Sequence, residues 1–147
     1  MPHKFNFRLE PVLEYRRMLE EKAKRAFAMA RREVLLQNIT ILNFMTEQEK
    51  GKMELRKLKV GKVDILTLRQ QEAYLNSLVR KIAKAYDELR VLMDKESKKR
   101  KELSEATKQV KVIERLKERR YKEYLYGVAR EEQKVLDEVG QNMYMRG

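Results

Sequence analysis

The chain has 147 residues, of which 35 are Lys or Arg and 23 are Asp or Glu, so its formal net charge is +12. It contains no cysteine, which excludes disulfides and thiol nucleophiles. Charged residues make up 39% of the sequence and aromatic residues only 7%, a composition typical of long helices or a coiled coil. Disorder is the less favoured alternative, because the apolar residues are regularly spaced.

The sequence carries no sign of membrane insertion or secretion. No apolar run approaches the roughly 20 residues that span a bilayer. The N-terminal residues MPHKFNFRLEP lack the apolar core of a signal peptide. We therefore expect a cytoplasmic protein.

The first expected helix begins near Pro11, because a missing amide donor is harmless in a first turn, and extends to about Lys59. Its apolar residues recur every three or four positions, which is typical of an amphipathic helix. Residues 23–30 are rich in alanine and would let a neighbouring helix approach closely. The pattern weakens near Gly51, since glycine lowers helix propensity.

The clearest interruption is the sequence KVGKVD at residues 59–64. Gly61 suits the left-handed conformation that ends a helix, and Asp64 can cap the next one. This second helix is predicted to extend to about Gly140. The segment 94–102 within it is wholly polar and is expected to be solvated. A nucleic-acid contact is less favoured there, because acids are mixed with the bases and no aromatic residue is interleaved.

These elements predict an all-α fold, a long antiparallel two-helix coiled coil that forms a single extended domain over residues 1–147. Two registers are compatible with the pattern. If the chain simply reverses at Gly61, residues 23–30 face the polar run 94–102. If the chain ends meet, residues 23–30 face about 120–127, and residues 60–91 form a bent tip or short helix. We prefer the second register, because it packs alanines against tyrosines.

Patterns typical of enzymes are missing from the sequence. His3 is the only histidine, and the five glycines are scattered, so no phosphate-binding loop is recognisable. We expect no catalytic residues, no metal site and no cofactor. What remains is a protein that acts through its surfaces.

Two sets of residues are candidate partner-binding positions. Tyr74 and Leu78 lie beside a narrow predicted seam of Leu75, Val79, Ile82, Tyr86 and Leu89. They either widen the intramolecular face or form a docking stripe. The apolar face of residues 110–139 is expected to be closed by the first helix. This segment would then bind a partner through its charged residues Arg115, Arg119, Arg120, Lys122 and Arg130.

The N-terminal sequence FNFRLEPVLEYRRMLEEKAKRAFAMARRE resembles the start of the flagellar FliJ family. The sequence IERLKERRYKEYLYGVAREEQKVLDEV resembles the C-terminal part of the same family, particularly in LKERR and in the late Leu136, Asp137 and Glu138. The resemblance implies a stalk-like, non-enzymatic component of the bacterial flagellar type III export apparatus.

The resemblance also implies partners. It implies binding to the hexameric flagellar export ATPase, whose assembly and activity the chain would promote, and contacts with the cytoplasmic domain of the membrane export gate and with export chaperones. The paired chain ends would enter the ATPase ring, and the central part would face the gate, which makes Tyr74 and Leu78 candidate gate contacts. A peripheral location at the cytoplasmic face of the inner membrane, held through these partners, would follow.

Other interpretations stay open. A generic coiled-coil adaptor or scaffold is the main alternative, and a basic helical nucleic-acid binder is less favoured, so no nucleic acid is expected. The chain could be a monomer, or a dimer in which two copies exchange helices at Gly61.

Overall fold

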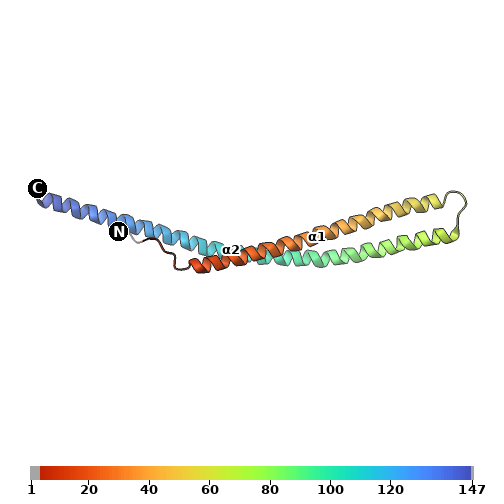
Figure 1. Ribbon diagram of the computed structural model, residues 1–147, viewed down its shortest axis with the longest axis horizontal. Helices are drawn as coiled ribbons and strands as arrows, with labels where there is room; N and C mark the ends of the chain where they lie inside the picture. The colour runs from red at the N-terminus through yellow and green to blue at the C-terminus, as the bar shows by residue number, and fades with distance from the viewer. Residues whose placement is uncertain (1–3, 147) are drawn as a thin grey trace. The chain divides into compact units, whose positions relative to one another are not determined.

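The computed structural model describes residues 4–146, which form two long helices joined by a short loop (Figure 1). Helix α1 spans Glu10–Leu58 and has 49 residues, and helix α2 spans Ile65–Arg146 and has 82 residues. No strand occurs in the part of the chain that the structure describes. The predicted all-α helical hairpin is therefore confirmed. His3 lies outside the described residues.

The contacts of the chain fall into two units. The first, which we call the terminal unit, comprises the described residues 4–22 and 104–146. The second, the loop unit, comprises Ala23–Leu103 and contains the connection between the helices. In each unit a part of α1 packs against an antiparallel part of α2.

The loop between the helices has the predicted geometry. The amide of Lys59 donates to the carbonyl oxygen of Leu55 at 3.2 Å and closes the last turn of α1. Gly61 then adopts a φ of 94°, the left-handed conformation that glycine tolerates best. This conformation lets α1 end and the chain reverse.

Asp64 caps the N-terminus of α2. Its Oδ1 accepts a hydrogen bond from the amide of Leu66 at 3.1 Å, and its Oδ2 accepts one from the hydroxyl of Thr67 at 2.8 Å. These bonds favour the ionised carboxylate. The Thr67 hydroxyl contributes most and the Leu66 amide next, and together they lower the pKa of Asp64 below its ordinary value of 3.8.

In the loop unit, buried and half-buried positions recur every three and four residues along both helices, the pattern of a coiled coil. We call these positions the loop-unit seam. The apolar members Ala30, Ile41, Leu78 and Ala85 are buried, with at most 3% of their surface exposed. On α1 the seam consists of Ala23, Phe27, Ala30, Val34, Gln37, Ile41, Phe44, Gln48, Gly51, Leu55 and Leu58, and on α2 of Leu68, Gln71, Leu75, Leu78, Ile82, Ala85, Leu89, Leu92, Glu96, Lys99 and Leu103.

Gly51 is a close-packing position in this seam. A Cβ atom added to Gly51 would lie only 2.7 Å from Cδ2 of Leu75 on α2. The amide Nε2 of Gln71 also donates to the carbonyl oxygen of Gly51 at 3.1 Å. The glycine that weakens the helical pattern of the sequence therefore lets α2 approach the backbone of α1.

The register is that of a simple reversal at the loop, so the preferred prediction that the chain ends meet is wrong. Glu33 pairs with Lys95 at 3.3 Å, and the guanidinium of Arg100 lies 5.6 Å from the ring centroid of Phe27. Residues 23–30 thus face the polar run 94–102 and not residues 120–127. Residues 65–91 belong to the continuous helix α2, and the expected bent tip or short helix is reduced to the loop itself.

The polar run fits the alanine-rich segment because its side chains are long. Glu96 and Lys99 occupy seam positions, and their side chains are only 17% and 31% exposed. Alanines on the facing helix leave room for the aliphatic parts of these side chains, while the charged ends reach water. Two members of the run are therefore part of the helix interface and not wholly solvated.

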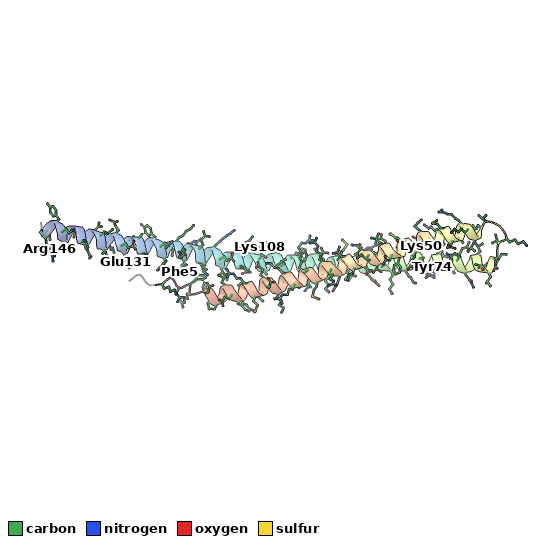
Figure 2. The ribbon with its side chains drawn as sticks, turned by 45° about the horizontal axis from the view of Figure 1, so that its top comes forward. Phe5, Lys50, Tyr74, Lys108, Glu131 and Arg146 are labelled. Atoms are coloured by element: carbon green, nitrogen blue, oxygen red, sulfur yellow. The ribbon has the colours of Figure 1, made fainter. Side chains whose placement is uncertain are left out.

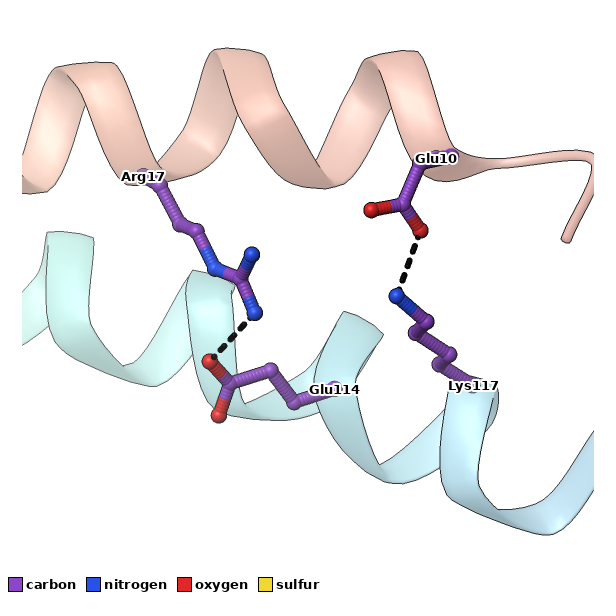
Figure 3. Close-up of polar contacts among 4 residues, drawn as sticks. All are labelled: Glu10, Arg17, Glu114 and Lys117. Carbon is purple, nitrogen blue, oxygen red and sulfur yellow. Dashed lines mark hydrogen bonds and ion pairs between the residues drawn. The ribbon is translucent and has the colours of Figure 1, made fainter. Parts of the chain in front are cut away.

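The terminal unit has a small core of its own. Phe7, Leu13 and Val110 are buried, with exposed fractions of 8%, 0% and 4%. Two ion pairs join the helices beside this core (Figure 3): Glu10 with Lys117 at 2.8 Å, and Arg17 with Glu114 at 3.4 Å. The first turn of α1, which contains Pro11 as predicted, is thereby fixed to α2.

The residues that precede α1 extend this packing. The ring of Phe5 lies against two tyrosines of α2, with centroid distances of 5.2 Å to Tyr121 and 5.5 Å to Tyr124. Aromatic pairs at such distances are attractive beyond the area that they bury. The apolar face of residues 110–124 is therefore covered by the N-terminal segment and the start of α1, not by residues 23–30.

Beyond Tyr124, α2 continues to Arg146 without a facing helix among the described residues. In Figure 2 this part runs from near Phe5 past Glu131 to Arg146. We call residues 125–146 the α2 tail. Apart from Val128, which is half-buried, its side chains are exposed. The predicted stop at Gly140 is wrong, because the helix passes through this residue.

Candidate interaction surfaces

The two residues predicted as a docking stripe have different environments. Tyr74 is 42% exposed, and its hydroxyl donates to Oε2 of Glu47 at 3.4 Å. Partial burial and, secondly, the negative charge of Glu47 raise its pKa above the ordinary value of 10.0. Leu78 is 0% exposed and belongs to the loop-unit seam. Its side chain is therefore not on the surface. Of the two alternatives, the structure shows the one in which Leu78 packs within the hairpin.

An apolar surface that the sequence analysis did not identify lies on one side of the loop unit. We call it the apolar face, and its six side chains are between 40% and 61% exposed. They are Leu35, Ile39 and Leu42 of α1 and Val79, Tyr86 and Met93 of α2. Val79 and Tyr86 were predicted to lie in the seam, and this prediction is wrong because both side chains are exposed.

The heptad pattern explains why these residues share a side. Val79, Tyr86 and Met93 each follow a seam residue of α2 by one position, which is about 100° around the helix. Leu35 and Leu42 likewise follow seam residues of α1, and Ile39 lies next to both on the helix surface, four residues after Leu35 and three before Leu42. In an antiparallel pair, equivalent flanks of the two helices lie on the same side of the interface. Tyr74 and the Glu33–Lys95 ion pair occupy the opposite flank.

The basic residues singled out in the terminal unit are all exposed. At about 100° per residue, four of them fall within one sector of α2 that points away from the core, and Lys108 joins them. We call this sector the basic face; it consists of Lys108, Arg115, Arg119, Lys122 and Arg130. Lys122 pairs with Glu118 at 3.3 Å, and the guanidinium of Arg130 lies 5.8 Å from the ring centroid of Tyr126.

Arg120 lies apart from the basic face. It lines an open groove of about 710 Å³ between the N-terminal segment and α2, together with Phe5, Phe7, Leu116 and Tyr124. The five predicted residues therefore do not form one cluster. Four belong to a continuous positive surface, and the fifth borders an aromatic groove.

The α2 tail carries an apolar stripe of its own. Leu125, Val128, Val135 and Val139 recur at multiples of three and four residues, and all but Val128 are between 47% and 58% exposed. The stripe is one residue out of step with the positions that are covered by α1 and the segment before it, such as Val110 and Tyr124. Continuing those positions would lead to polar residues or glycine, namely Gly127, Glu131, Lys134 and Glu138. The tail stripe thus does not continue the hairpin interface.

Within residues 4–146, no helix has both the length and the apolar character that crossing a membrane requires.

Comparisons with known proteins agree with this architecture. The chain matches the model of the family described as flagellar FliJ protein over residues 5–147. A solved structure of a YscO homologue from Chlamydia trachomatis is similar, with a TM-score of 0.57 and 20% sequence identity, over 97% of this chain and 96% of that chain. At this identity the likeness shows the fold alone. No curated protein matches the sequence. Because the family match extends over nearly all of the sequence, the chain belongs to the flagellar FliJ protein family.

Proposed function

We propose that the chain is a non-enzymatic, stalk-like component of the flagellar type III export apparatus that binds the export ATPase ring and promotes its assembly and activity. Membership of the FliJ family supports the assignment to the export apparatus. The proposed ATPase contact rests on the α2 tail, which has an exposed apolar stripe and no facing helix among the described residues.

The tail has the properties of a segment whose apolar side chains are buried by a partner protein. Most helical stability in proteins comes from burying an apolar face, and the apolar stripe of the tail is left exposed. Burying Leu125, Val135 and Val139 in a partner would contribute roughly 5 kcal/mol. That contribution favours binding in a narrow, apolar-lined channel such as the centre of a ring.

The basic face lies beside the tail and supports the same proposal. Positive side chains on one sector of a helix attract an acidic surface and accelerate association at low ionic strength. We assign Arg115, Arg119, Lys122 and Arg130 to this steering role. Arg120, at the aromatic groove, would contact the part of the ring that meets the N-terminal segment.

For the export gate, we propose the apolar face of the loop unit as the contact. It offers exposed aliphatic and aromatic side chains on two helices, which is the composition of a protein interface core. Tyr74 borders the opposite flank and would add a peripheral contact, whereas Leu78 would act only by holding the two helices together. Contacts with export chaperones and a peripheral location at the inner membrane belong to the same proposal.

The test separates the two surfaces. Val135→Ser/Val139→Ser should lose most stimulation of the purified export ATPase and keep binding to the cytoplasmic domain of the gate. Leu42→Ser/Val79→Ser should keep stimulation of the ATPase and lose most binding to the cytoplasmic domain of the gate. Tyr144→Ser is the matched control, because Tyr144 is exposed on the side of α2 opposite to Val135. If the tail variant stimulates the ATPase as well as wild type does, the assignment of the tail is wrong.

A further inference from the structure

The loop that joins the helices combines exposed apolar side chains with lysines. Val60, Ile65 and Leu66 are 81%, 64% and 66% exposed, and Val63 is 43% exposed. Val60 and Val63 belong to the connection between the helices, and Ile65 and Leu66 are the first two residues of α2, so all four lie close to the point where the chain reverses. None of them contributes to the loop-unit seam. The structure therefore keeps four aliphatic side chains in water at the point where the chain reverses.

The same turn is strongly positive. From residue 56 to residue 69 the sequence has five cations, Arg56, Lys57, Lys59, Lys62 and Arg69, and one acid, Asp64, which gives a net charge of +4. The carboxylate of Asp64 already accepts two hydrogen bonds from the start of α2. In the described part of the chain, Lys59 and Lys62 form no ion pair, although Lys57 lies 3.9 Å from Glu54. The positive charge of the turn is thus mostly uncompensated.

We propose that this loop binds the surface of an anionic lipid bilayer. Val60, Ile65 and Leu66 would insert among the headgroups, and Lys59 and Lys62 would meet the lipid phosphates. Apolar side chains at a tip with cations next to them suit shallow insertion, which requires no complementary pocket. Basic residues close to an anionic leaflet strengthen such binding additively. This contact goes beyond membrane association through partner proteins, and it uses neither the α2 tail nor the apolar face.

The first experiment is flotation of the full chain with vesicles of phosphatidylcholine alone or with 30% phosphatidylglycerol, in about 0.1 M salt. We expect binding only to the anionic vesicles. Lys59→Gln/Lys62→Gln should weaken the partition coefficient by roughly 30-fold, since one cation near the surface contributes about fivefold. Val60→Ser/Leu66→Ser should weaken it by on the order of tenfold, because aliphatic burial is lost.

The matched control is Lys98→Gln/Lys101→Gln, which removes the same charge from exposed positions of α2. These residues lie about 50 Å along the helix from Leu66, well beyond the Debye length of about 10 Å at this salt concentration. We expect this control to bind nearly as wild type does. Equal weakening by both lysine pairs would mean that net charge alone attracts the protein to vesicles, and would overturn the proposal.

A second readout reports insertion directly. Because the chain has no cysteine, Val60→Cys and Ser97→Cys each provide a unique site for the environment-sensitive dye NBD. Anionic vesicles should increase and blue-shift the emission of the dye at position 60 and leave position 97 unchanged. Unchanged emission at position 60, with loss of gate binding in Lys59→Gln/Lys62→Gln, would show that the loop binds an acidic protein surface and not a bilayer.

Discussion

The side chain of Gln37 on α1 donates a hydrogen bond from Nε2 to the main-chain carbonyl oxygen of Ala85 on α2, at 2.9 Å. The bond is possible because Ala85 is small and buried, so the glutamine reaches the backbone of the other helix. Gln71 on α2 makes the equivalent bond to Gly51 on α1. A polar residue at an interface position specifies the register of a coiled coil, and in this hairpin one glutamine of each helix donates to the backbone of the other.

The first prediction concerns this bond. Gln37→Ala should lower the free energy of unfolding by about 1 kcal/mol, the usual net contribution of one hydrogen bond. Urea denaturation followed by circular dichroism measures the change. Asn38→Ala at the neighbouring residue provides the control, since the side chain of Asn38 is exposed and forms no hydrogen bond within the described residues. Equal stability of the two variants would contradict a role of Gln37 in the interface.

The second prediction compares two helical glycines. Gly51→Ala gains about 1 kcal/mol of helix propensity but places a Cβ 2.7 Å from Leu75, and such overpacking costs about 1–3 kcal/mol. We expect a net loss of roughly 1 kcal/mol in urea denaturation. Gly127→Ala meets nothing within 4 Å and should increase the helical signal at 222 nm. A stabilised Gly51→Ala variant would show that Leu75 moves aside without cost.

The third prediction separates packing from binding at adjacent residues. Leu78→Ala should destabilise the hairpin by about 2–5 kcal/mol, because it leaves a cavity in the seam. Val79→Ala changes an exposed residue and should stay within about 0.5 kcal/mol of wild type. Thermal unfolding measures both. On the proposed function, Val79→Ala weakens gate binding in the folded protein, whereas Leu78→Ala does so only when the loop unit unfolds.

The fourth prediction is a pH dependence at the start of α2. The pKa of Asp64 is lower in the folded chain than its ordinary value of 3.8, so its capping bonds stabilise the helix fully above that value. This stabilisation is lost as the pH falls through the lowered pKa. As the pH falls through this pKa, amide exchange at residues 66–68 should accelerate more in wild type than in Asp64→Asn, because the asparagine side chain does not titrate. The same acceleration in both proteins would contradict the assignment.

The ends of the interhelical loop were predictable because their signals are local. Gly61 needs a positive φ, and Asp64 has the side chain of a helix cap, so each residue points to one structure. The same reasoning failed at Gly140, because glycine ends a helix only when the chain also leaves the helical conformation. Otherwise it is tolerated at a cost of about 1 kcal/mol.

The register was not predictable from the arguments used. Both registers have the same heptad periodicity, and alanines accept either tyrosines or the long stems of Glu96 and Lys99. The interhelical contacts that identify the register in the structure, at Gln37 and Gly51, join residues far apart in sequence. Assigning the heptad continuously through the polar run would have placed Leu78 in the seam and Val79 outside it. That step would also have revealed the apolar face.

The one-residue offset of the tail stripe separates the requirements of folding from those of binding. A longer N-terminal helix that continued the hairpin interface would meet Glu131 and Lys134, not Val135, so the chain cannot bury the stripe by extending its own interface. Substitutions in the stripe can therefore change which partner is bound, and how tightly, while the hairpin keeps its stability. Members of such a family could diverge in partner specificity at the tail without first acquiring compensating changes in the core.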